Sequence, residues 1–290
     1  MEGNRIESVR HRIRRQACAL AALAALGLGG RAQAVEAPAV TPANQAQALQ
    51  RLVDLAAIQE LMSRHAWYYS AGQHQRELDE LFTMDQPDVS FGTNAGYWVG
   101  AKSLQYAYVD WFERQARKDL AALSKRHPEI KDVPENLLAG TMMIHTLTTP
   151  LIVVAGDGKT AKGLFYSPGQ VTQTPLGQPS ANYMWERYAI DFIKEGDDWR
   201  IWHFTVYTDF SVPPGGDWTK PTPAGAQLVV QPGEVLPWED PEAPKFDAPG
   251  SGYQSYGIDV VRGEKPKIPV PYRTFSETFS YGAPAKAGQP

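Results

Sequence analysis

The chain has 290 residues, of which 43% are hydrophobic and 21% are charged, and its formal net charge is −4 at pH 7. This length and composition are typical of a globular protein with one large domain or two small ones. The acidic excess and the lack of a basic stripe argue against nucleic acid and anionic membranes as partners. The unusual feature is the aromatic content, with 8 Trp, 13 Tyr and 10 Phe.

Residues 1–34 have the pattern of a targeting segment. An arginine-rich start is followed by an apolar run from Ala17 to Gly30, and Ala32-Gln33-Ala34 is an A-x-A cleavage pattern. The run is too short to span a bilayer, so we expect a removed signal peptide and export to the periplasm. Arg14-Arg15 points weakly to the twin-arginine route. The alternative is a disordered tail. The only cysteine, Cys18, would leave with this segment.

The next part of the chain is a Pro/Ala-rich linker at 35–48, and a domain is expected over 49–210. Apolar residues recur at spacings of three and four from Gln45 to about Ser70, which predicts a helix that Ala71-Gly72 ends. Two further helices are predicted at 75–82 and at about 101–126, with short strands at 85–91 and 94–99 between them.

The segment from Gly140 to Phe210 is rich in β-branched and aromatic residues and predicts three or four long antiparallel strands. Turn residues at 156–159 and 195–198 separate them. Residues 211–290 are dense in Pro and Gly and predict an irregular arm that covers the domain or a partner subunit. Three helices followed by a curved antiparallel sheet form an α+β cone.

Several motifs occur in the order found in one known family. They are LxxLFTMD from Leu78, Gly100 before a helix, MIHTLTTPLIVVAGDGKTAKG from Met143, and GDDWRIWHF from Gly196. Together, over about 49–210, they resemble the SnoaL-like branch of the NTF2-like superfamily. The resemblance implies a cone with an apolar pocket, and a homodimer. Its members include cofactor-free dehydratases, isomerases and cyclases as well as binding modules, so the fold does not fix the function. Many members carry an acidic residue where Ala71-Gly72 stands here.

Two histidines on the predicted strands are the first catalytic candidates. The resemblance implies that His145 faces the pocket; the alternative is a core histidine with one hydrogen bond. Strict alternation along 199–209 places His203, Tyr207 and Asp209 on the pocket wall, whereas a one-residue bulge would turn His203 to solvent. Asp209 could orient a histidine or act as a base. A metal held by His145, His203 and Asp209 is a minor alternative, so we predict no metal.

Tyrosine hydroxyls can polarise a carbonyl or phenol or pass a proton, and we assign Tyr69 such a catalytic role. Arg187 could hold an anionic group, or pair with Glu186 or Asp191 on the sheet surface. We expect His65 to be structural, and His74 and His127 to face solvent. No nucleotide or hydrolase motif occurs, and no cofactor is expected. The substrate-binding candidates, for which core packing is the alternative, are Tyr68, Tyr97, Trp98, Tyr166, Trp185, Arg187, Tyr188 and Tyr207.

Three functions fit these residues. The first is a cofactor-independent lyase acting on an aromatic small molecule, in the manner of the formaldehyde-releasing lyases of lignin-derived diarylpropanes. Loss of water and formaldehyde through a quinone methide would there give a stilbene. The second is a dehydratase or isomerase of a polyketide- or steroid-like ring. The third is a non-catalytic periplasmic module that binds a small molecule.

Overall fold

The computed structural model describes residues 39–220 and 228–284. The predicted signal peptide and the start of the linker lie outside these residues. The chain divides into two compact units, 1–48 and 49–290. Of the first unit, the structure describes a short turn and the first residues of helix α2 (Gln45–Ser70). In the described ranges no helix is both long and apolar enough to cross a membrane.

The helices lie close to where the apolar spacing predicts them. Helix α2 ends at Ser70, and Gly72 just beyond it has a φ of +66°, the left-handed conformation that glycine adopts without strain. Helix α3 follows at His74–Leu81. The third predicted helix consists of α4 (Ala101–Leu104), a π-helical stretch (Gln105–Asp110) and α5 (Trp111–Arg126).

The strands form one eight-stranded, mostly antiparallel sheet. Its order is β3-β5-β6-β7-β1-β2-β8, with β4 paired to β5, and β1 runs parallel to β7. Tight turns with positive-φ glycines at Gly158 and Gly196 connect β4 to β5 and β6 to β7, as predicted. The strands are β1 (Ser90–Gly92), β2 (Gly96–Val99), β3 (Met142–His145), β4 (Thr148–Val154), β5 (Thr160–Gln173), β6 (Ser180–Glu195), β7 (Asp198–Val212) and β8 (Ala248–Pro249).

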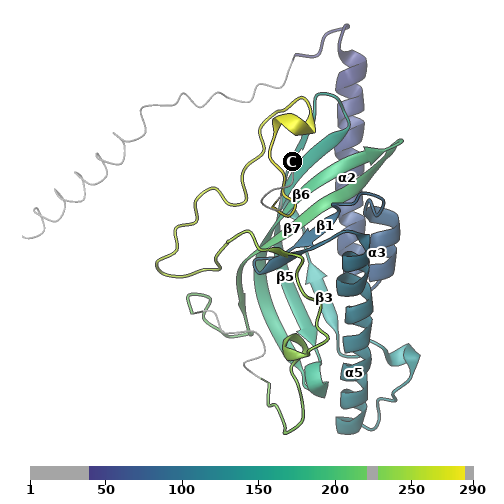
Figure 1. The fold of residues 1–290 in the computed structure, drawn as a ribbon, viewed down its shortest axis with the longest axis vertical. Helices are drawn as coiled ribbons and strands as arrows, with labels where there is room; N and C mark the ends of the chain where they lie inside the picture. The colour runs from purple at the N-terminus through teal and green to yellow at the C-terminus, as the bar shows by residue number, and fades with distance from the viewer. Residues whose placement is uncertain (1–38, 221–227, 285–290) are drawn as a thin grey trace, which may run out of the picture. The chain divides into compact units, whose positions relative to one another are not determined.

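The two faces of the sheet are covered by different parts of the chain. Helices α2, α3 and α5 lie along one face (Figure 1), which we call the inner face. The main core is there and includes Ile58, Leu78, Phe192 and Phe204. The C-terminal segment, residues 228–284, has little regular structure. Its first part contacts α5 through Asp240 and Glu242, and its later part, from Tyr253 on, covers part of the opposite, outer face. The α+β cone that the sequence predicts is therefore confirmed.

Bulges in β7 decide which of its side chains reach the inner face. The pairing with β6 shifts between His203 and Ile201, so that Trp202 is an extra residue in β7. Ile201 is in the inner core, and after the bulge Phe204 and Val206 take the inner positions. His203 therefore points to the outer face. A second shift, at Asp209, lies near the end of the strand.

Candidate functional site

Two adjoining cavities lie between the inner face of the sheet and the helices. We call them the inner cavity, of about 280 Å³, and the outer cavity, of about 380 Å³. Both lie on the inner face of the sheet, and the outer cavity is not on its outer face. They share Tyr69, Phe91, Tyr108 and Gln173 as lining residues. Apolar rings dominate both walls, as is usual in sites for small organic molecules. The inner cavity is lined by His65, Tyr69, Phe91, Thr93, Tyr108, His145, Val171, Gln173, Met184, Glu186, Tyr188, Phe204, Val206 and Thr208.

The first polar group of the inner cavity surrounds His145 at the end of β3. Its Nδ1 lies 3.2 Å from the Tyr188 hydroxyl, 3.3 Å from Glu186 Oε2 and 3.4 Å from the Ser167 hydroxyl. All four side chains are buried. Gly169 makes room for the imidazole, because a Cβ at that position would lie 2.8 Å from the ring. His145 therefore faces the cavity as expected, with a carboxylate and two hydroxyls on one ring nitrogen.

The second polar group is centred on Glu77 of α3, which is completely buried. Its Oε1 lies 2.6 Å from His65 Nδ1, and its Oε2 lies 2.9 Å from His74 Nδ1 and accepts a hydrogen bond of 3.1 Å from the Tyr108 hydroxyl. Burial alone would raise the pKa of Glu77, but the attraction of His65 and the hydrogen bonds from both histidines outweigh burial and lower it. Glu77 is thus held as a carboxylate.

The carboxylate of Glu77 orients His65. Because Nδ1–H donates to Glu77, Nε2 of the same ring keeps its lone pair and can accept a proton, as in other histidine–carboxylate pairs. The His65 ring lines the inner cavity and packs edge-on against Phe204, with centroids 4.9 Å apart. His65 and His145 thus face the same cavity, each with its own carboxylate.

Three tyrosines complete the inner cavity; Tyr188 is buried, and Tyr69 and Tyr108 are half-buried. The pKa of Tyr69, Tyr108 and Tyr188 is raised, first by burial and further by the nearby carboxylates Glu186 and Glu77. Their hydroxyls therefore stay protonated and serve as hydrogen-bond donors. The Tyr69 ring lies edge-on to His145, with centroids 5.3 Å apart. Of the predicted tyrosines, Tyr69 and Tyr188 line this cavity.

Other sequence-predicted residues of β2 and β7 lie elsewhere. Tyr97, His203, Tyr207 and Asp209 were expected on the pocket wall, and the structure corrects this: none lines either cavity. For the β7 residues the cause is the bulge at Trp202, which exchanges the two faces of the strand. Tyr207 packs instead against Tyr253 of the C-terminal segment.

His203 is not turned to solvent, because the C-terminal segment covers it. Its Nδ1 lies 2.9 Å from Asp191 Oδ2, and Asp191 Oδ1 accepts a hydrogen bond of 2.5 Å from the buried Lys162 ammonium. The backbone N–H of Tyr281 donates to Asp191 over 2.7 Å, and the Ser280 hydroxyl over 3.0 Å. This cluster, Lys162–Asp191–His203, holds the C-terminal segment on the outer face.

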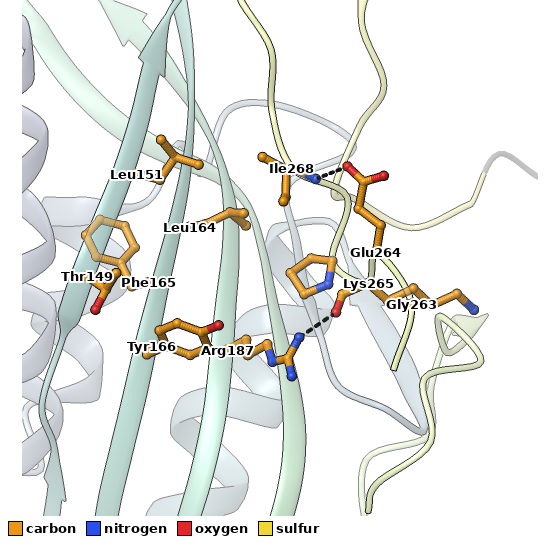
Figure 2. A pocket seen from close by; sticks show the side chains of 11 residues that line it. Thr149, Leu151, Leu164, Phe165, Tyr166, Arg187, Gly263, Glu264, Lys265 and Ile268 are labelled. Atoms are coloured by element: carbon orange, nitrogen blue, oxygen red, sulfur yellow. Dashed lines mark hydrogen bonds between the residues drawn. The ribbon is translucent and has the colours of Figure 1, made fainter. Parts of the chain in front are cut away.

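Arg187, Tyr166 and Trp185 are also on the outer face rather than in the cavities. Arg187 pairs with Asp209 over 2.9 Å and donates to the Lys265 carbonyl over 3.0 Å. Figure 2 shows Arg187 and Tyr166 in a groove of about 220 Å³ between the sheet and the C-terminal segment. The ion pair predicted for Arg187 exists, but its partner is Asp209.

The remaining candidates divide between the helix surface and the outer cavity. Tyr68 donates to Glu80 over 2.6 Å on the exposed side of the helices, so it does not line a cavity. Trp98 lines the outer cavity, as does His74, which was expected in solvent but is buried. His127 is exposed as expected.

Sequence reasoning did not place Glu77 and His65 together, nor His65 in the wall of a cavity. A signal for Glu77 was present: in α3 the residues at helical spacing on the buried side are His74, Glu77, Leu78 and Leu81. A glutamate on an apolar helix face needs partners, because an unpaired buried charge is costly. No spacing rule connects it to His65 on another helix. Among the described residues, no three His, Cys, Asp or Glu side chains are arranged to hold a metal ion.

Comparison with solved structures shows similar chains of low identity. A protein of unknown function from Mycobacterium tuberculosis is 16% identical, with a TM-score of 0.38; the match covers 68% of this chain and 86% of that one. A type 3 hexachlorocyclohexane dehydrochlorinase from Novosphingobium barchaimii is 14% identical, with a TM-score of 0.40; the match covers 58% of this chain and 95% of that one. An NTF2-like protein with a cystatin-like fold from Novosphingobium aromaticivorans is 17% identical, with a TM-score of 0.36; the match covers 58% of this chain and 90% of that one.

The sequence comparisons give one assignment. No curated protein matches the chain. The SnoaL-like domain family matches residues 50–205, more than half of the 290 residues and the part that contains both histidine–carboxylate pairs. The chain therefore belongs to the SnoaL-like domain family.

Proposed function

We propose that this protein is a cofactor-independent lyase that acts on an aromatic small molecule. The observation that supports it best is the pair of histidines, His65 and His145, which face one ring-lined cavity with a carboxylate on each. General acid–base chemistry needs one group to take a proton and another to give one. Aromatic walls hold a substrate ring by stacking.

For the substrate we propose a lignin-derived diarylpropane-1,3-diol with a para-hydroxyphenyl ring. Loss of the benzylic hydroxyl as water leaves a quinone methide, into which the phenol oxygen has pushed an electron pair. Removal of the proton from the terminal hydroxyl then breaks the adjacent C–C bond and releases formaldehyde. The electron pair of that bond forms the stilbene double bond and returns a pair to the phenol oxygen, which takes back the proton it lost when the quinone methide formed. Atoms and electrons balance within the substrate, so no oxidant or reductant is required.

The geometry suggests a division of roles. His65 Nε2, with Nδ1–H held by Glu77, is placed to take the proton of the terminal hydroxyl. His145, beside Glu186 and the Tyr188 hydroxyl, is placed to protonate the leaving benzylic hydroxyl. Tyr69, which lies against His145 and remains protonated, can donate a hydrogen bond to a substrate oxygen.

The test is to incubate the protein with a diarylpropane-1,3-diol and measure formaldehyde and stilbene fluorescence. We expect one formaldehyde for each stilbene. Water loss without formaldehyde would favour the dehydratase alternative. No product from a folded protein would remove this substrate class.

The variant His145→Ala separates an enzyme from a binding module. As an enzyme, we expect turnover to fall about 10²- to 10⁴-fold, the usual contribution of a general acid, while ligand affinity changes little. Unchanged turnover in the variant would remove the acid role from His145. No turnover in the wild-type protein, with unchanged affinity in both, would favour a binding module. The homodimer and the export to the periplasm that the sequence predicts stand as proposals beside this function.

A further inference from the structure

The outer cavity adjoins the reaction site but holds none of the groups assigned to the reaction above, apart from Tyr69 on the shared wall. Its walls are aromatic, from Trp98 of β2, Trp111 and Phe112 of α5, and Trp238 of the C-terminal segment. Its volume of about 380 Å³ is within the range of small-molecule sites. A molecule that reacts in the inner cavity can therefore extend into the outer cavity.

Buried polar atoms without partners are concentrated around the outer cavity. Among the described residues, five buried side-chain nitrogen or oxygen atoms have no hydrogen-bond partner, and three of them belong to residues that line this cavity: His74 Nε2, Trp98 Nε1 and Gln115 Nε2. The indole and the amide are N–H donors. Leaving a buried donor unsatisfied destabilises a protein, so a cluster of them beside a cavity points to a ligand that accepts hydrogen bonds there.

An acceptor lies beside these donors. Asp119 is one helical turn beyond Gln115 on α5, so the two side chains share a face, and both line the outer cavity. Asp119 Oδ1 accepts the Leu176 N–H over 3.1 Å, which leaves Oδ2 for a ligand. Burial raises the pKa of Asp119 to about 6, so near neutral pH it is still an acceptor, and it disfavours an anionic ligand.

We infer that the outer cavity is a subsite for a second aromatic ring that carries a hydroxyl next to another oxygen. Asp119 accepts the hydrogen bond of the hydroxyl, and Gln115 and Trp98 donate to the neighbouring oxygen. The tryptophan rings hold the plane of the ligand ring by stacking. Only the assignment of the other ring to the inner cavity rests on the proposed function.

The test uses single-ring probes that cannot undergo the reaction. Binding of 2-methoxyphenol and of toluene is measured by calorimetry, and the bound position by the indole N–H resonance of Trp98, assigned from its loss in Trp98→Phe. We expect 2-methoxyphenol to shift that resonance. In Gln115→Leu its affinity should fall about tenfold, the effect of one hydrogen bond of about 1.4 kcal/mol, whereas toluene should bind at least as well as to the wild-type protein.

Two more variants complete the design. Asp119→Asn keeps the shape and the bond to Leu176 but replaces Oδ2 by a donor, so it should also weaken 2-methoxyphenol and spare toluene. The matched control Gln59→Leu, on the exposed surface of α2, should change neither affinity. An unshifted Trp98 resonance, or equal effects of Gln115→Leu on the two probes, would overturn the subsite. Probe binding as expected without turnover of any diarylpropane would leave the subsite standing and remove the lyase proposal.

Discussion

Replacing the buried Glu77 by glutamine tests whether it positions a catalytic histidine or only fills the core. Three groups bond to it: His65, His74 and Tyr108. Glutamine has the same shape and can still accept from His65 Nδ1–H. Its amide N–H groups can donate to the Tyr108 oxygen, and to His74 Nδ1 once the His74 proton moves to Nε2. Bonds to a charged acceptor contribute about 1.5–3 kcal/mol and neutral ones about 0.5–1.5, so each surviving bond weakens by roughly 1 kcal/mol.

Removing the buried charge offsets part of this loss, because burying a carboxylate costs several kcal/mol. We therefore expect the free energy of unfolding of Glu77→Gln to change by no more than about 2 kcal/mol. Activity should respond far more, because an uncharged partner no longer stabilises the protonated His65. We expect kcat to fall about 10²- to 10⁴-fold. KM should change little, because Glu77 lines neither cavity.

Urea unfolding gives the stability of the variant, and formaldehyde release gives its kcat and KM. The matched control is Glu80→Gln on the same helix. Glu80 is exposed and bonds to Tyr68 and Arg76 at the surface, so its replacement should alter stability by less than about 1 kcal/mol and leave kcat unchanged. A folded Glu77→Gln protein with wild-type kcat would refute the role given to His65.

Two further predictions concern the outer face. Burial alone would lower the pKa of His203, but hydrogen bonds to Asp191 and Asp88 outweigh burial and raise it. Protonated His203 therefore stabilises the folded protein. This contribution is complete below the pKa of the unfolded chain, about 6.5, and is lost as the pH rises through the higher pKa of the folded state. Proteolysis of the C-terminal segment should therefore be faster at pH 9 than at pH 6. A proteolysis rate that does not depend on pH would contradict this, and so would the same pH dependence in the variant His203→Gln. Met142, Ile144, Tyr166 and Trp185 are 39–45% exposed on the outer face, so light scattering should show a dimer that Trp185→Glu weakens; a monomeric wild-type chain would count against it.

The fold could be predicted from the sequence because its signals are local. Helical spacing of apolar residues placed α2 and α3 within one residue of their ends, and turn residues at 156–159 and 195–198 marked the hairpins. His145 was placed by the family resemblance, and the transfer succeeds because β3 pairs regularly with β5 as far as Gly169, so no bulge changes its face. For the helices and turns, the deciding interactions lie within a few residues along the chain.

The site on β7 could not be predicted in the same way. A bulge adds one residue to one strand, and no residue type around Trp202 indicates it. The side chains between it and the second bulge at Asp209 nevertheless change face. His65 and Glu77 are likewise twelve residues apart on different helices and meet only when α2 and α3 pack. Histidine–carboxylate contacts occur on both faces of this sheet, in the cavity and under the C-terminal segment. Residue type alone therefore cannot separate catalytic from structural pairs. The difference lies in the surroundings of the second ring nitrogen. The rings of His65 and His145 line a cavity, whereas His203 has a carboxylate on each nitrogen, Asp191 on Nδ1 and Asp88 3.5 Å from Nε2, and lies beneath Gly282.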